Sequence, residues 1–140
     1  LHDITKEMPF EEQLNLCTSR GIITNYDGVT LQNLIHALSG AIIAREEFGA
    51  PEAVARAIAR HTTGGDGMTL IDKIIFGADM AAYGRSYDGV SELRACMLES
   101  LDRGVLEALL RTEAHTAEMG WEAAPETLAG IEYMKKICTK

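Results

Sequence analysis

The chain has 140 residues, 46% of them hydrophobic, and a formal net charge of −8, so it is long enough for a single domain with a sizeable core over residues 1–140. The acidic balance, without a basic stripe, argues against binding a nucleic-acid polymer, although a small anionic nucleotide can still bind where a metal ion supplies positive charge. No apolar run is long enough to span a membrane, and no basic segment followed by an apolar one marks a signal peptide.

Apolar residues at spacings of three and four, bounded by Pro or Gly, predict helices along the first half of the chain. Gly21 and Gly49 follow two of these patterns as C-caps, and Pro9 and Pro51 stand at first-turn positions of two of them. The predicted helices cover residues 11–20, 30–48 and 51–60, with a connector over residues 22–28.

The second half follows the same pattern after a loop over residues 62–67. Thr69, with Asp72 three residues later, predicts a capping box at the start of a helix. The apolar stripe of this helix, from Ile71 to Ala82, should face the core. Further helices are predicted over residues 91–101, 103–119 and 126–138, the last with Pro125 at its start. Because no segment alternates as a strand does, the predicted class is all-α.

The cysteines indicate the compartment. Cys17, Cys96 and Cys138 are odd in number and widely spaced. This pattern is typical of reduced thiols and not of a disulfide framework. We therefore expect a cytoplasmic protein.

Histidine is scarce, with four in the chain, and three of the four belong to a sparse series of metal-type side chains. The series consists of His2, Asp3, His36, His61 and Asp79. Its spacing is too long for a zinc finger and suits a metal centre assembled from several helices. The fourth histidine, His115, lies in an ordinary amphipathic segment and is not expected to be a ligand.

Each member of the series also has a simpler interpretation. His36 lies four residues before Gly40, which could leave space for a metal or mark a close helix crossing around a core histidine. His61 falls where its helix ends and could stabilise that C-terminus. Asp79 continues an apolar stripe, where a carboxylate needs a cation, an arginine such as Arg85, or a proton. Taken together, the residues favour a metal centre.

Residues 1–7, LHDITKE, resemble the LHDxxKE signature of HD-domain metal-dependent phosphohydrolases. Three further segments resemble the YqeK-like branch of that family in order and spacing: HALSGAIIAREEFG from His36, ARHTTGGDGMT from Ala59, and IDKIIFGADMAAYGRSYDGVSELR from Ile71. The resemblance implies an HD-domain helical bundle. It also implies a symmetrical bis(5′-nucleosyl)-tetraphosphatase, which hydrolyses diadenosine tetraphosphate to two ADP.

The resemblance further implies a dinuclear metal centre with a metal-activated water. Asp3 would bridge two divalent ions, one also held by His2 and Asp79, the other by His36 and His61. Iron is the favoured metal, with manganese, cobalt or magnesium as alternatives. A helix carrying His2-Asp3 would have preceding turns, and the family has a further histidine ligand upstream. Because the chain begins with Leu rather than Met, we expect the N-terminal helix or helices of the domain to lie outside this sequence.

Other residues are predicted to act on or bind the nucleotide. The predicted catalytic residues are Asp3, Lys6 and Arg85, and the predicted substrate-binding residues are Lys6, Thr62, Thr63, Gly64 and Arg85. Lys6, one helical turn after the His-Asp pair, could instead be an ordinary exposed lysine. Arg85 could pair with Asp79 or a surface acid instead of binding phosphate as a bidentate fork. The loop after His61 could be a simple turn.

The segment after Asp79 departs from the family pattern. The family commonly has KIEPGR there, whereas this chain has MAAYGR over residues 80–85, so a Lys and a Glu are lost and substrate choice can differ. Two alternatives stay open: an HD hydrolase of nucleoside monophosphates or alarmones, and a non-catalytic nucleotide-binding HD sensor. The expected partner is a nucleotide, and the expected state a monomer or homodimer.

Overall fold

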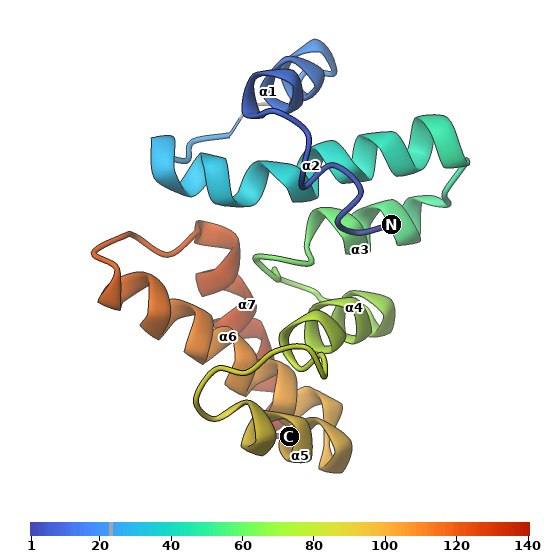
Figure 1. Ribbon diagram of the computed structural model, residues 1–140. Helices are drawn as coiled ribbons and strands as arrows, with labels where there is room; N and C mark the ends of the chain where they lie inside the picture. The colour runs from blue at the N-terminus through green and yellow to red at the C-terminus, as the bar shows by residue number, and fades with distance from the viewer. Residues whose placement is uncertain (23) are drawn as a thin grey trace. The chain divides into compact units, whose positions relative to one another are not determined.

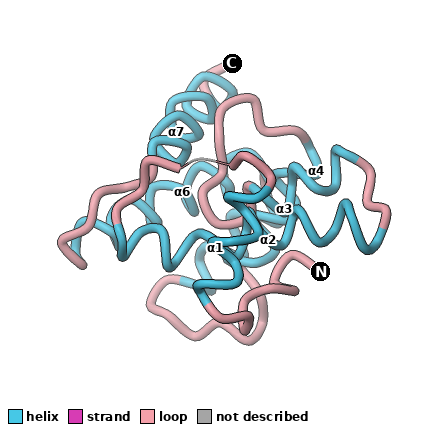
Figure 2. Tube along the Cα trace, turned by 90° about the horizontal axis from the view of Figure 1, so that it is seen from above, coloured by secondary structure: helices cyan, strands magenta, loops and turns pink. Residues whose placement is uncertain are grey.

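The structure is a computed structural model that describes residues 1–22 and 24–140. These residues form seven α-helices and no strand, and Figure 2 shows the helices joined by loops, so the predicted all-α class is confirmed. Ile23, within the predicted connector, lies outside the described residues. No helix in the described ranges is both long and apolar enough to cross a membrane.

The chain divides into two compact units, residues 1–62 and residues 63–140. The first contains α1 (Phe10–Ser19), α2 (Gly28–Phe48) and α3 (Glu52–Ala59). Within it, α3 runs back antiparallel along α2, and α1 packs against α2 (Figure 1). Its buried apolar residues form two clusters, one of Cys17, Ile35 and Ile42 and one of Ala41, Ala44 and Ile58. The single-domain assignment stays a prediction.

Cap residues set the bounds of these helices. The Asp27 side chain accepts a hydrogen bond of 3.0 Å from Thr30 N, and this N-cap starts α2 earlier than predicted. Gly49, at φ 63°, ends α2 in the left-handed conformation, which confirms the predicted C-cap. Pro9 and Pro51 occupy N-cap positions and not the first turns predicted for them.

The segment that carries His2 and Asp3 is not the helix expected there. Residues 1–8 form successive turns, because the backbone hydrogen bonds from Ile4, Lys6 and Met8 each reach only three residues back. In Figure 1 this dark-blue segment crosses α2. Since these bonds all lie inside the segment, other contacts must attach it to α2.

The second unit contains α4 (Leu70–Met80), α5 (Val90–Glu99), α6 (Leu101–Glu118) and α7 (Pro125–Cys138). Within it, α6 and α7 lie side by side and antiparallel, and α4 and α5 also pack against α6 (Figure 1). Its buried core consists of Met68, Phe76, Leu93, Val105, Ala108, Leu109, Ile131 and Met134. One apolar core drawn from all four helices therefore holds this unit together.

Helix starts in the second unit also follow cap chemistry. Thr69 and Asp72 form the predicted capping box. The Ser100 hydroxyl accepts a hydrogen bond from Arg103 N, so one residue ends α5 and begins α6, which starts earlier than predicted. Pro125 begins α7 as predicted.

The helix α4 buries a different face from the one predicted. Phe76 is fully buried, whereas Ile74 is 46% exposed and Ala78 is also exposed. Gly77 also lies on the buried face, and a Cβ at this position would lie 3.2 Å from Met97 Sδ. The buried face of α4 therefore carries Asp72, Phe76 and Gly77 in place of the predicted stripe.

Candidate metal centre

Three of the predicted ligands converge within the first unit. Asp3 Oδ1 lies 3.2 Å from His61 Nε2 and 3.4 Å from His36 Nε2. The two imidazole Nε2 atoms are 3.2 Å apart. The three side chains come from the N-terminal turns, from α2 and from the turn after α3. The fold therefore brings residues from distant parts of the sequence to one point.

His61 is positioned by the last turn of α3. Its side chain is 1% exposed, and its Nδ1 lies 2.6 Å from the carbonyl oxygen of Ile58. A carbonyl only accepts hydrogen bonds, so Nδ1 carries the proton and Nε2 presents a lone pair. Metal-bound histidines commonly donate from the second ring nitrogen in this way. The helix-end contact and the ligand role thus use different nitrogens of one ring.

His36 is held in a similar manner on α2. Its side chain is 12% exposed, and the ring is hydrogen-bonded to the backbone of Asn33. Burial, reinforced by the neighbouring His61, lowers the pKa of His36 and outweighs the opposing attraction of Asp3. The ring is therefore neutral at neutral pH, which is the form that binds metal ions.

The two oxygens of Asp3 face different neighbours. Oδ1 faces the His36 and His61 rings, whereas Oδ2 lies 3.5 Å from His2 Nε2 and 3.7 Å from Lys6 Nζ. Partial burial by itself raises the pKa of Asp3, but His2, Lys6 and the other two histidines together bring it below its ordinary value. The carboxylate is thus ionised and offers an oxygen on each side.

The donor set fits a divalent metal ion. One oxygen of Asp3 and one nitrogen each of His36 and His61 all lie within 4.8 Å of one another. Acceptor atoms that face each other repel unless a cation or a proton lies among them. Two imidazoles and a carboxylate are ligands that zinc, iron and manganese accept.

The space beside Gly40 is not a metal cavity, contrary to one interpretation of the sequence. A Cβ at Gly40 would lie 3.3 Å from the carbonyl oxygen of His2 and 3.6 Å from Thr5 Oγ1. The glycine therefore admits the backbone of the N-terminal segment. The His2 ring itself lies edge-on to His61, with centroids 4.9 Å apart.

The remaining predicted ligand, Asp79, lies on α4 in the second unit and pairs with Arg85. Arg85 Nη2 lies 3.4 Å from Asp79 Oδ1, and Arg85 Nε donates to the Asp79 carbonyl oxygen at 3.2 Å. The structural pairing considered from the sequence is therefore present. The ligand role of Asp79 and the phosphate role of Arg85 stay predictions.

Within the second unit, Thr63 and Gly64 make structural contacts. The Thr63 hydroxyl donates to the Gly64 carbonyl at 2.9 Å, and Thr127 Oγ1 donates to the Thr63 carbonyl at 2.9 Å. A Cβ at Gly64, whose φ is 67°, would lie 2.7 Å from Leu109 Cδ2. These contacts give Thr63 and Gly64 a structural role. Substrate binding by Thr62, Thr63 and Gly64 stays a prediction.

A solved structure decides the family. No model of a protein family matches the chain. The structure of a predicted HD superfamily hydrolase involved in NAD metabolism, from Clostridium acetobutylicum, superposes with a TM-score of 0.89 and 33% sequence identity. The match covers 99% of this chain and 73% of that one. The chain belongs to the HD superfamily of hydrolases.

Curated relatives agree with the branch of the HD superfamily predicted from the sequence. The symmetrical bis(5′-nucleosyl)-tetraphosphatase of Halalkalibacterium halodurans is 37% identical over 97 residues, which are 69% of this chain and 52% of that protein. The Bacillus subtilis protein of the same name is 28% identical over 134 residues, 95% of this chain and 72% of that protein. The chain thus spans about half the length of the first relative and about seven tenths of the second.

Sequence reasoning missed the polar residues that attach the His-Asp segment of this HD-superfamily chain to α2. Thr5, Gln13 and Ser39 are 1%, 5% and 0% exposed. All three hydrogen-bond to one another or to nearby backbone. The available signal was Ser39, a polar residue three positions after His36 in an otherwise apolar part of its helix.

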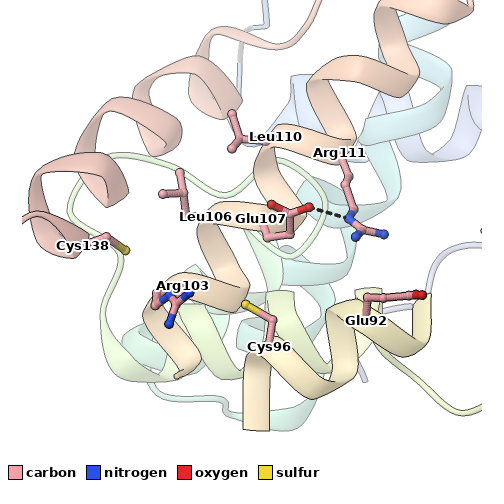
Figure 3. Close-up of a pocket in the computed structure, with 8 residues that line it drawn as sticks. All are labelled: Glu92, Cys96, Arg103, Leu106, Glu107, Leu110, Arg111 and Cys138. Carbon is pink, nitrogen blue, oxygen red and sulfur yellow. Dashed lines mark hydrogen bonds and ion pairs between the residues drawn. The ribbon is translucent and has the colours of Figure 1, made fainter. Parts of the chain in front are cut away.

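A separate cavity of about 430 Å³ lies among α5, α6 and α7 of the second unit (Figure 3). Its lining residues are Glu92, Cys96, Arg103, Leu106, Glu107, Leu110, Arg111 and Cys138. The lining includes two arginines and two glutamates, and Arg111 donates to Glu107 and to the Gly89 carbonyl. Burial raises the pKa of the Cys138 thiol. Balanced charges and a protonated thiol make this cavity chemically unlike the group around Asp3.

Proposed function

We propose that this HD protein is a metal-dependent hydrolase of dinucleoside tetraphosphates that releases two ADP from diadenosine tetraphosphate. The observation that carries the proposal is the convergence of Asp3 Oδ1 with the Nε2 atoms of His36 and His61. The names of the curated relatives support the substrate class. Because the chain spans about half the length of the first relative, the substrate is proposed for the whole protein.

Asp3, His36 and His61 would hold a divalent ion in the first unit through the three atoms that face one another. We propose a second ion with Asp3 as the shared carboxylate, supported by its Oδ2, which faces away from the two histidines toward His2. His2 and Asp79 remain ligands predicted from the family resemblance. When bound, such ions stabilise phosphate charge and acidify a water molecule.

Lys6 places a positively charged side chain beside Asp3. Its side chain is 52% exposed, and its Nζ lies 3.7 Å from Asp3 Oδ2. A positive charge at the edge of the carboxylate can attract and orient an anionic tetraphosphate chain. We propose the same type of contact for Arg85, whose guanidinium can bind phosphate with two nitrogens.

The test is release of ADP from diadenosine tetraphosphate by the full-length protein, with iron, manganese, cobalt or magnesium added. We expect metal-dependent formation of two ADP per substrate and its loss in Asp3→Asn. Glu122→Gln, which changes an exposed acid of the second unit, is the matched control and should retain the wild-type rate. Absence of ADP with every metal, or an undiminished rate in Asp3→Asn, would contradict the proposal.

The same assay separates the alternatives. Turnover of nucleoside monophosphates or of guanosine alarmones, with diadenosine tetraphosphate left intact, would indicate a different HD hydrolase. Nucleotide binding without turnover of any of these substrates would indicate a sensor.

A further inference from the structure

We propose that Thr5, Ser39 and Gln13 form a positioning network that fixes Asp3 relative to His36 and so sets the metal affinity of the site. The inference rests on the proposed metal-binding function and deepens it. It starts from the N-terminal segment, whose turns are made by backbone hydrogen bonds from Ile4, Lys6 and Met8, each to the residue three positions earlier. Such turns define a local shape but do not define where Asp3 lies on α2.

The attachment comes from a buried run of side-chain hydrogen bonds. Thr5 Oγ1 lies 2.7 Å from Ser39 Oγ, Ser39 Oγ donates to Gln13 Oε1 at 2.9 Å, and Gln13 Nε2 donates to the Met8 carbonyl at 2.8 Å. Each hydroxyl has one proton: Ser39 donates to Gln13, so Thr5 shares its proton between Ser39 Oγ and the His36 carbonyl oxygen, and the run is directed from Thr5 through Ser39 and Gln13 to Met8. The run therefore starts and ends on the N-terminal segment and passes through α2.

The network also reaches the backbone of a metal-type residue. Thr5 Oγ1 lies 2.9 Å from the carbonyl oxygen of His36. Thr5 is two residues from Asp3 in the sequence, so a single side chain connects the carboxylate segment to the histidine that faces it. The Asp3 Oδ1 to His36 Nε2 distance of 3.4 Å depends on this connection.

Gly40 provides the close approach that the network requires. A Cβ there would lie 3.3 Å from His2 O, so the N-terminal backbone would have to shift by a few tenths of an ångström, and it would also contact Thr5 Oγ1 at 3.6 Å. Ser39 and Gly40 thus form adjacent small positions on α2, one that bonds the segment and one that admits it. The Ser39 hydrogen bond to Thr5 and the close approach of the His2 carbonyl to Gly40 involve the residues on either side of Asp3.

The expected loss of metal affinity follows from how little variation in ligand distance a metal site tolerates. Ligand atoms must hold their distances within about 0.2 Å, and loss of outer-shell hydrogen bonds typically lowers metal affinity about 10–100-fold. Removing the Thr5 hydroxyl should therefore weaken metal binding by about that factor. A purely structural hydrogen bond would instead change stability and leave the affinity of the folded protein unchanged.

The experiment compares metal binding by wild type, Thr5→Val, Ser39→Ala and Thr5→Ser, using Mn(II) titrations and the visible absorption spectrum of the Co(II) form. Thr5→Val keeps the shape and loses the hydroxyl, whereas Thr5→Ser keeps the hydroxyl. We expect weaker Mn(II) binding by about 10–100-fold and an altered Co(II) spectrum in the first two variants. Thr5→Ser should resemble wild type.

Thr18→Val is the matched control, since the exposed Thr18 hydroxyl bonds only within α1. Circular dichroism of the metal-free proteins verifies that each variant is folded, and Ser39→Ala tests the network if Thr5→Val is not. Unchanged Mn(II) affinity and Co(II) spectrum in the folded variants would overturn the positioning role, while wild-type metal binding would still uphold the metal site on which the proposed function depends. No metal binding by wild type would overturn both.

Discussion

The two units of the chain differ in what they bury and where. The first places Thr5, Gln13, Ser39 and His61 in its interior, where the N-terminal turns meet α2 and α3. The second also buries Thr63, Asp72 and Thr127, but these lie beside one apolar core shared by four helices. Satisfied buried polar groups add little net stability but define geometry, whereas apolar burial supplies most of the stabilising free energy. We therefore expect changes in the second unit to affect mainly stability, and changes in the first to affect mainly the site.

The largest effect on stability should come from the core of the second unit. Phe76→Ala removes a fully buried ring and should lower the free energy of unfolding by about 3–5 kcal/mol, measured by denaturant titration. Leu98→Ala, at an 89% exposed position, should change it by less than about 0.5 kcal/mol. Equal losses in the two variants would contradict the assigned core.

The complementary change in the first unit is Asp3→Asn. It removes the charge that faces His36 and His61, and should weaken Mn(II) binding more than the roughly 100-fold upper range for outer-shell changes. The unfolding free energy of the metal-free protein should change little, and Glu122→Gln should bind as wild type. An Mn(II) affinity within tenfold of wild type would show that Asp3 is not a metal ligand.

Metal removal should give a smaller effect that depends on concentration. At a free metal concentration ten times the dissociation constant, binding to the folded state alone adds about 1.4 kcal/mol of stability. A chelator should therefore lower the melting temperature of wild type, and leave that of Asp3→Asn nearly unchanged. A melting temperature insensitive to metal in wild type would argue against a folded-state site.

A helix cap of the second unit should give the smallest effect. Thr69→Ala removes the hydroxyl that accepts from Asp72 N and should destabilise by about 1 kcal/mol with no change in metal affinity. Thr18→Ala, at an exposed hydroxyl that bonds within its own helix, should cost less. A loss of metal binding in Thr69→Ala would contradict the expectation that changes in the second unit affect stability and not the metal site.

Local chemistry explains which parts of the fold were predictable. The end of α2 at Gly49 and the start of α4 at Thr69 depend on neighbouring residues only, so sequence patterns found both. The buried face of α4 depends on contacts with other elements, such as the packing of α4 against α6, which no pattern within α4 encodes. The turns of residues 1–8 were mistaken for a helix because their stabilising partner, Ser39, lies on another element.

For the candidate site, the sequence predicted which residues are metal-type side chains but not the contacts that hold them in position. The types and order of Asp3, His36 and His61 indicated a metal centre, and the structure brings these three together. The lone pair that His61 presents depends on a contact with the Ile58 carbonyl, and the placement of Asp3 depends on the contact of Thr5 with α2. Both are tertiary contacts that become visible only in the fold.

The N-terminal turns have a consequence for the order of folding. Asp3 reaches its partners only across sequence separations of 33 residues to His36 and 58 residues to His61, and contacts over such separations form late because long loops must close first. The helices α2 and α3, joined by a short turn, can pair before the N-terminal segment attaches. The final step of folding in the first unit would then be the one that completes the ligand set, and the rate at which the refolding chain acquires metal would report on that step.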